Sequence, residues 1–71
     1  MACLNSDGTI TESAKKLLVS LKTPKTPEEV ARSLEEPLYK IRSSLREMRN
    51  YGFVAAYKEE YVLTDKGKTA I

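Results

Sequence analysis

Residues 26–54 constrain the fold most, because two helical patterns follow each other there with only a proline turn between them. Thr26 suits the N-cap of the first pattern, with a proline in the first helical position and Glu29 where a capping box needs it. In the second pattern, residues 37–51, apolar residues recur at spacings of three, four and three, which indicates one buried helix face. Those residues are Leu38, Ile41, Leu45 and Met48. Gly52 then permits the left-handed conformation that commonly ends a helix.

The residues before this stretch form two segments of different character. Residues 1–8 are polar and have no periodicity, so we expect a flexible tail followed by one domain over residues 9–71. Thr9, with Glu12 three residues later, predicts a capping box. The helix that it opens has apolar residues at helical spacing and is expected to run to about Lys22, where a cation suits the negative end of the helix dipole.

The period changes after residue 52. Residues 53–58 and 61–64 are rich in aromatic and β-branched side chains, which predicts two short strands. Two glutamates between them are unfavourable in a two-residue turn that needs positive φ, so we expect a loop of three or four residues. The proline-bounded connector at residues 24–27 is expected to be extended and to pair weakly as an edge strand. Thr64 should cap a final helical turn that Gly67 weakens.

Length and charge narrow the class of function. A chain of 71 residues forms one domain with a thin core and has no room for a domain-sized catalytic cleft. The 12 basic and 10 acidic residues give a net charge of only +2, but the charges are unevenly placed. Residues 37–51 carry four cations against one glutamate, whereas residues 27–36 carry four glutamates against one arginine. Only the second helix therefore suits a phosphate backbone.

Several chemistries are not expected from this sequence. One cysteine and no histidine exclude an internal disulfide and make a zinc or other metal site unexpected. No acid–base pair, nucleophile with its base, or glycine-rich phosphate loop is recognisable, so we expect no enzyme and no cofactor. The N-terminus lacks a signal-peptide pattern, and no apolar run approaches the roughly 20 residues that span a bilayer. We therefore expect a soluble, cytoplasmic protein that does not bind membranes.

The ordered pattern is helix, short strand, helix, helix, strand, strand. Residues 34–54, LEEPLYKIRSSLREMRNYGFV, and residues 61–68, YVLTDKGK, resemble the winged helix-turn-helix domains of prokaryotic transcriptional regulators. The matching positions are Leu34, Ile41, Leu45 and Gly52-Phe53-Val54. The resemblance covers residues 9–71 and implies an α+β fold, mostly α: a winged helix with a three-helix helix-turn-helix core and a small antiparallel β-hairpin wing. Two departures are the acidic wing tip and Leu38, where the family usually has a polar residue.

We interpret the chain as a DNA-binding transcriptional regulator, or the DNA-binding domain of one, that places helix 37–51 in the major groove of double-stranded DNA. A lone domain of this size would gain affinity as a homodimer or on several half-sites. The alternative is a winged-helix module for protein–protein interaction, which the acidic wing tip, the acidic residues 27–36 and the near-neutral charge favour. A merely solvated basic helix face and a piece of a larger regulator also remain open.

Six residues of this helix are candidate DNA contacts. At about 100° per residue, four side chains project opposite the apolar stripe and two cations flank them. The four are Tyr39, Ser43, Arg46 and Asn50, and the two are Lys40 and Arg42. Arg46 suits a guanine edge, whereas Lys40 and Arg42 suit phosphates. Arg49 is expected nearer the core, with its aliphatic stem packed there.

Three residues outside this helix are further candidates. Lys25 and Thr26 precede the acidic helix and could contact phosphate through an ammonium group, a hydroxyl and backbone N–H groups. For Thr26 a purely structural cap is at least as well supported, because the following glutamates would repel a phosphate. Lys58, in the wing, could follow the minor groove or the DNA backbone, although a lysine beside two glutamates also fits a solvated turn.

Overall fold

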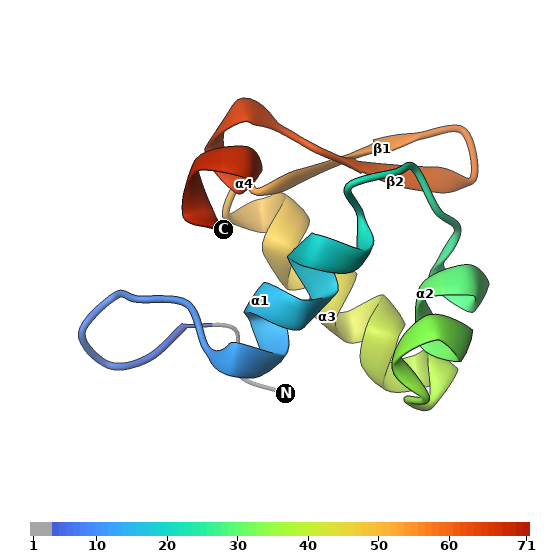
Figure 1. Ribbon diagram of the computed structural model, residues 1–71, viewed down its shortest axis with the longest axis horizontal. Coiled ribbons are helices and arrows are strands. Elements are labelled where there is room, and N and C mark those ends of the chain that lie inside the picture. Colours follow the sequence, from blue (N-terminus) through green and yellow to red (C-terminus); the bar gives the residue numbers. More distant parts are fainter. Residues whose placement is uncertain (1–3) are drawn as a thin grey trace.

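The structure is a computed structural model that describes residues 4–71 (Figure 1). Its elements are α1 (Glu12–Ser20), α2 (Pro27–Leu34), α3 (Leu38–Asn50), β1 (Val54–Tyr57), β2 (Glu60–Leu63) and α4 (Asp65–Ala70). Helices α1, α2 and α3 pack together, and the antiparallel hairpin of β1 and β2 lies across one end of them with α4 beside it. This mostly helical α+β architecture agrees with the predicted fold class. No helix within the described residues has the length and apolarity to cross a membrane.

The core is built from one face of each of the first three helices and from the residues that enter the hairpin. Its buried apolar residues are Ala14, Leu17, Leu18, Leu21, Val30, Ala31, Ile41, Leu45, Met48, Phe53 and Val54. Three of the four residues that define the apolar stripe of α3 have no exposed surface, and Leu38 is partly buried. The periodicity of α3 therefore identifies its inward face, to which the buried Ser44 also belongs, and the opposite side of the helix is open to solvent.

Residues 4–10 form a closed turn, where the sequence predicts part of a flexible tail. Leu4 and Ile10 make an antiparallel bridge and pack, partly buried, against the core. The N–H and hydroxyl of Thr9 donate to the Asp7 carboxylate at 3.0 and 2.7 Å. The bond from the Thr9 hydroxyl and then the bond from its N–H lower the pKa of Asp7, and the hydroxyl bond has the larger effect. The other predicted tail residues, 1–3, lie outside the described part of the chain.

The first helix begins two residues later than predicted. Its N-cap is Thr11, whose side chain accepts a hydrogen bond from the Ala14 N–H at 3.1 Å. The prediction of Thr9 as the cap is wrong, because the Thr9 hydroxyl is bonded within the preceding turn. The helix also ends at Ser20, before the predicted Lys22, and Leu21 forms its C-cap.

The start of α2 forms the predicted capping box. The Thr26 hydroxyl accepts from the Glu29 N–H at 3.2 Å, and the Thr26 N–H donates to the Glu29 carboxylate at 2.9 Å. Pro27 occupies the first helical position, as predicted. The bond from the Thr26 N–H, followed by the contribution of its hydroxyl, lowers the pKa of Glu29.

The capping box makes the stability of the folded protein depend on pH in the acidic range. Because the folded-state pKa of Glu29 is lowered, its stabilising contribution is present above the ordinary value of 4.5 and is lost as the pH falls through the lowered value. The unfolding free energy of the wild type should therefore fall between neutral pH and that acidic range. We expect it to fall by less in Glu29→Gln, which has no carboxylate to protonate at this position. Urea denaturation at a series of pH values measures this difference. Glu28→Gln, the same charge change without a capping contact, should keep the wild-type profile; equal profiles for all three proteins would contradict the prediction.

A short turn joins α2 to α3. Glu35 adopts the left-handed conformation with φ 56°, and the Glu36 N–H donates to the Ala31 carbonyl at 3.0 Å. Pro37 is the N-cap of α3, one position before the helical position predicted for it, because its ψ of 142° is extended. At the other end, Gly52 has the predicted left-handed conformation with φ 87°. The turn holds the acidic α2 and the basic α3 against each other.

The hairpin turn is shorter than predicted. Val54 pairs with Leu63 and Tyr57 with Glu60, so only two residues, 58 and 59, connect the strands. The expected loop of three or four residues is wrong, because Lys58 takes the left-handed conformation with φ 57° although it is not glycine.

The connector between α1 and α2 pairs with the hairpin, as predicted. Lys25 and Tyr61 exchange two backbone hydrogen bonds of 2.8 and 3.3 Å, which form a single antiparallel bridge. The bridge fixes β2 beside the residue that precedes the cap of α2. It therefore sets the position of the hairpin relative to the α2–α3 pair.

The last helix closes over the end of the hairpin. Its N-cap, Thr64, accepts from the Gly67 N–H at 3.1 Å and donates through its hydroxyl to the Gly52 carbonyl at 2.5 Å. Gly67 is buried, and a Cβ added there would lie 2.0 Å from the Phe53 carbonyl oxygen. Glycine is therefore required by this close approach, where the sequence alone indicates only a weakened helical turn.

Candidate nucleic-acid interface

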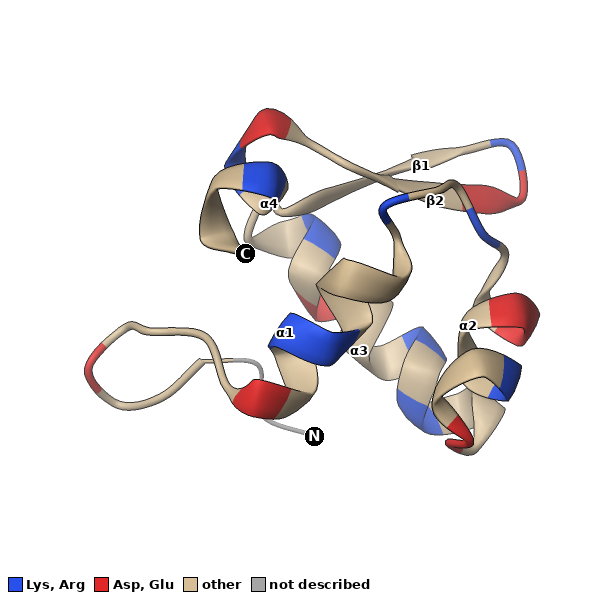
Figure 2. Ribbon diagram, viewed as in Figure 1, with Lys and Arg blue, Asp and Glu red and all other residues tan. Residues whose placement is uncertain are grey.

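The outer side of α3 is open and polar. All six residues that the sequence singles out on this helix are exposed: Tyr39, Lys40, Arg42, Ser43, Arg46 and Asn50. Tyr39 is 71% exposed, so its ring and hydroxyl are accessible from solvent. Figure 2 shows basic segments along α3 and acidic segments at the start of α2 and at the hairpin tip. The charge separation expected from the sequence is thus retained in space.

One flank of α3 borders a surface hollow that gathers three arginines. The hollow measures about 350 Å³, and its lining residues are Pro27, Arg42, Arg46, Arg49 and Tyr61. We call it the arginine hollow. The guanidinium-bearing residues come from α3, and the opposite wall comes from the first residue of α2 and from β2. A concave surface with three cations suits an anionic ligand.

Arg49 and Tyr61 are the residues of this hollow that the sequence interpretation missed. Arg49 is exposed and lines the hollow together with Arg42 and Arg46, a role that the sequence interpretation did not give it. The sequence could have indicated that the three arginines lie together, because positions 42, 46 and 49 have the spacing of one helix face. Tyr61 was not recognisable, since it reaches the hollow only through the hairpin and its bridge to Lys25.

The three guanidinium groups have no competing partners in the described part of the chain. Within residues 4–71, none of them takes part in a side-chain hydrogen bond or an ion pair. Like charges at a spacing of four residues on a helix repel each other weakly, by about 0.2–0.5 kcal/mol per pair. An anion placed in the arginine hollow would offset this repulsion.

Lys25 and Thr26 are both bonded inside the fold. The Lys25 ammonium group donates to the Ser20 carbonyl at the end of α1 and to the Thr23 hydroxyl at 3.0 Å. The hydroxyl and N–H of Thr26 are used by the capping box with Glu29. Lys25 and Thr26 thus each have a structural role, Lys25 at the end of α1 and Thr26 at the start of α2.

Lys58 is exposed but stands apart from the arginines. It lies in the two-residue turn, with its ammonium nitrogen 5.6 Å from the centre of the Tyr57 ring. A second shallow hollow is lined by Thr26, Lys58, Glu59 and Glu60. Two carboxylates therefore accompany the one ammonium group, and the hairpin tip offers a phosphate much less attraction than the arginine hollow does.

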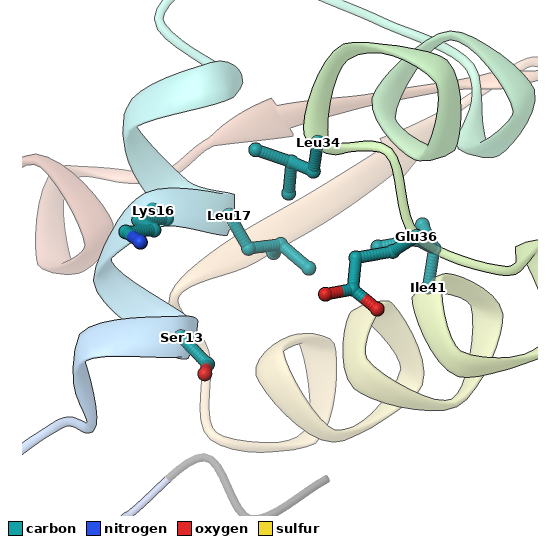
Figure 3. A pocket seen from close by; sticks show the side chains of 6 residues that line it. All are labelled: Ser13, Lys16, Leu17, Leu34, Glu36 and Ile41. Atoms are coloured by element: carbon teal, nitrogen blue, oxygen red, sulfur yellow. The ribbon is translucent and has the colours of Figure 1, made fainter.

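A smaller hollow lies between α1 and the α2–α3 turn (Figure 3). It measures about 130 Å³ and is lined by Ser13, Lys16, Leu17, Leu34, Glu36 and Ile41. Since a water occupies about 30 Å³ in the liquid, the space suits a few waters. In residues 4–71 there is no group of three side chains of the types that bind metals. The arginine hollow and the exposed face of α3 remain the strongest candidate site.

Comparisons with protein-family models, with curated proteins and with solved structures found no match. The assignment of a function therefore depends on the residues of this chain and on their arrangement.

Proposed function

We propose that the chain is a winged-helix DNA-binding domain of a transcriptional regulator. In this proposal α2 and α3 form a helix-turn-helix, α3 enters the major groove of double-stranded DNA, and the hairpin is a short wing. An α-helix fits the major groove of B-DNA, and its outward side chains can reach the base edges there. A homodimer, or binding to several half-sites, would supply the affinity that one small domain lacks.

One observation supports this proposal. Helix α3 buries one side and leaves the other side open, and its three guanidinium groups have no hydrogen-bond or ion-pair partner within residues 4–71. A basic helix used only for solubility would gain from carboxylate partners, and α3 has a single glutamate among its thirteen residues. The neighbouring acidic α2 presents Glu28 and Glu29, which would keep a phosphate backbone away from its first turn. DNA would therefore approach from the α3 side.

Titration of a labelled random-sequence duplex, followed by fluorescence anisotropy at two salt concentrations, tests the proposal. Binding should weaken with salt, with a slope of log K against log salt of about −0.9 for each phosphate contacted. Binding that does not respond to salt, or no binding at low salt, would contradict DNA recognition by α3.

Arg46 should determine base preference as well as affinity. It is exposed on the side of α3 opposite the buried stripe, and a bidentate arginine–guanine pair contributes about 1–3 kcal/mol of discrimination. We expect Arg46→Ala to weaken binding and to flatten the base preference at one position of the selected sequences. Selection from a random duplex pool with the wild type and the variant measures this. An unchanged preference would remove Arg46 from the base-reading surface.

A protein-binding module is the second candidate, because exposed aromatic and acidic groups occur together outside α3. Tyr57 is 65% exposed on β1, beside the glutamates of the hairpin tip. Such a surface fits a basic protein partner rather than nucleic acid. Capture of one tight protein partner by the wild type, together with no shift of any duplex, would favour this candidate.

A further inference from the structure

The arginine hollow and the hairpin tip (residues 57–60) carry opposite charges that are not neutralised inside the fold. The hollow gathers three guanidinium groups, and among residues 4–71 no aspartate or glutamate lines it. The tip presents the carboxylates of Glu59 and Glu60. Within the same residues, neither carboxylate has a hydrogen-bond or ion-pair partner. Each surface therefore has charge available for a ligand of the opposite sign.

The tip does not neutralise the hollow of its own chain. Glu60 and Tyr61 are consecutive residues of β2, and successive side chains of a strand point to opposite faces. Tyr61 lines the arginine hollow, so the Glu60 side chain is directed away from it and lines the other hollow instead. The bridge between Lys25 and Tyr61 holds this part of β2 in place. The carboxylates of the tip are thus available to another molecule.

The tip is narrow and exposed. Only residues 58 and 59 connect its strands, and paired strands lie about 4.8 Å apart. Tyr57 is 65% exposed, and the Lys58 ammonium nitrogen lies 5.6 Å from the centre of its ring. The one cation of the tip is therefore drawn to the tyrosine of its own strand. A convex acidic tip of this kind is complementary to a concave basic hollow of about 350 Å³.

The acidic and basic surfaces adjoin each other. Thr26 and Glu60 line the hollow at the tip, and their neighbours in the sequence, Pro27 and Tyr61, line the arginine hollow. Figure 2 shows the acidic hairpin tip and the acidic start of α2 at the same end of the molecule. Adjoining complementary surfaces favour reciprocal pairing, because a two-fold axis that brings one tip to a hollow brings the second tip to the other hollow. Such an arrangement closes at a dimer.

We propose that the arginine hollow binds the hairpin tip of a second copy of this chain, in a two-fold dimer that pairs each tip's carboxylates with the other copy's guanidinium groups. The inference goes beyond the proposed function and does not depend on it. Ion pairs between exposed side chains are individually weak, so the dimer is transient and sensitive to salt. Because it covers both arginine hollows, it differs from a homodimer that binds two half-sites of DNA, and a duplex would compete with it.

Sedimentation equilibrium of the wild type tests the dimer. The apparent mass should approach twice that of the monomer at low salt and at protein concentrations up to about 1 mM. The dissociation constant should rise by at least about tenfold between roughly 0.05 and 0.5 M NaCl, because salt screens exposed charges. A monomer throughout the low-salt series would overturn the proposal. A mass that continues to rise beyond the dimer would overturn the reciprocal arrangement.

Charge reversal tests the pairing itself. Glu59→Lys/Glu60→Lys places cations on the tip, and Arg42→Glu/Arg46→Glu places carboxylates in the hollow. Each variant alone opposes like charges and should be monomeric. An equimolar mixture of the two restores opposite charges at both contacts and should form a heterodimer with a dissociation constant within about tenfold of that of the wild type. A mixture that stays monomeric would overturn the proposal.

A control variant separates local pairing from net charge. Lys15→Glu/Lys16→Glu makes the same charge change on the exposed side of α1 and leaves both surfaces intact, so it should dimerise like the wild type. Mixed with the basic-tip variant, it keeps only one of the two contacts and should associate at least about tenfold more weakly than the charge-reversed pair. Equal association of the two mixtures would show that net charge determines binding, and would overturn the proposal.

Titration of the random-sequence duplex with the wild type distinguishes this inference from the proposed function. A wild type that binds the duplex but is monomeric at low salt would overturn the dimer alone. A wild type that dimerises but does not bind the duplex would overturn the proposed function alone. Thermal melts followed by circular dichroism confirm that each charge-reversed variant is folded before it is mixed.

Discussion

Gly67→Ala should destabilise the fold by about 3 kcal/mol, the upper part of the range for overpacked sites. The added methyl group would lie 2.0 Å from the Phe53 carbonyl oxygen, which is backbone and cannot rotate away. The same oxygen accepts the Thr64 N–H at 3.1 Å, so a shift of α4 would also strain the cap of that helix. For a domain of this size, the loss corresponds to a decrease in Tm of roughly 12–24 °C.

Helix propensity predicts the opposite sign, which makes this variant informative. Alanine is favoured over glycine by about 1 kcal/mol inside a helix, so a free α4 would be stabilised by the change. Lys68→Ala in the same helix is the control, because Lys68 is exposed and should change stability by no more than about 0.5 kcal/mol. Thermal and urea denaturation measure both variants. A Gly67→Ala protein as stable as the wild type would show that α4 does not pack on Phe53 as described.

Arg42→Ala/Arg46→Ala should weaken binding of a random-sequence duplex by about 100-fold at low salt. A hydrogen bond to a charged group contributes about 1.5–3 kcal/mol, and each 1.4 kcal/mol is a factor of ten in affinity. Neither guanidinium group has an internal partner among residues 4–71, so their loss should leave the fold intact. Fluorescence anisotropy gives the affinities, and the thermal melt of each protein reports folding.

Lys15→Ala/Lys16→Ala removes the same charge from the exposed side of α1 and provides the comparison. If α3 forms the DNA-binding surface, this variant should bind within a fewfold of the wild type, since only the long-range field of the protein changes. Equal weakening by the two double variants would mean that net charge, and not the surface of α3, determines binding.

The elements that the sequence predicted well are those fixed by local rules. The capping box of Thr26 and Glu29 involves residues three apart, and it forms as predicted. The buried stripe of α3 follows from helical periodicity, and Ile41 and Leu45 indeed have no exposed surface. The sequence also predicted that the proline-bounded connector is extended and pairs weakly as an edge strand, and the bridge between Lys25 and Tyr61 is such a pairing.

The elements that were predicted incorrectly depend on contacts between distant segments or on a choice between similar local patterns. Thr9 and Thr11 both suit an N-cap, and the bond from Thr9 to Asp7 decides between them. Arg49 and Tyr61 line the same hollow although they lie in different elements, which periodicity within α3 does not report. The need for glycine at position 67 likewise arises from the approach of α4 to the chain at Phe53, fourteen residues earlier.

The candidate site was predicted only in part for the same reason. The sequence identified the exposed residues of α3, since exposure on a helix follows from its buried face. It did not show that the Lys25 ammonium group is bonded to the end of α1, which gives this candidate a structural role. The DNA-binding role and the winged-helix assignment remain predictions that binding experiments must test.

The most direct test maps a duplex onto the folded protein by NMR. A ¹⁵N-labelled sample is titrated with a random-sequence duplex at low salt, and changes in amide chemical shifts are followed residue by residue. DNA recognition by α3 predicts the largest changes from Tyr39 to Asn50 and near Tyr61, with little change on the exposed side of α1. Changes concentrated on α1 or at the hairpin tip, or no changes at saturating duplex, would contradict it.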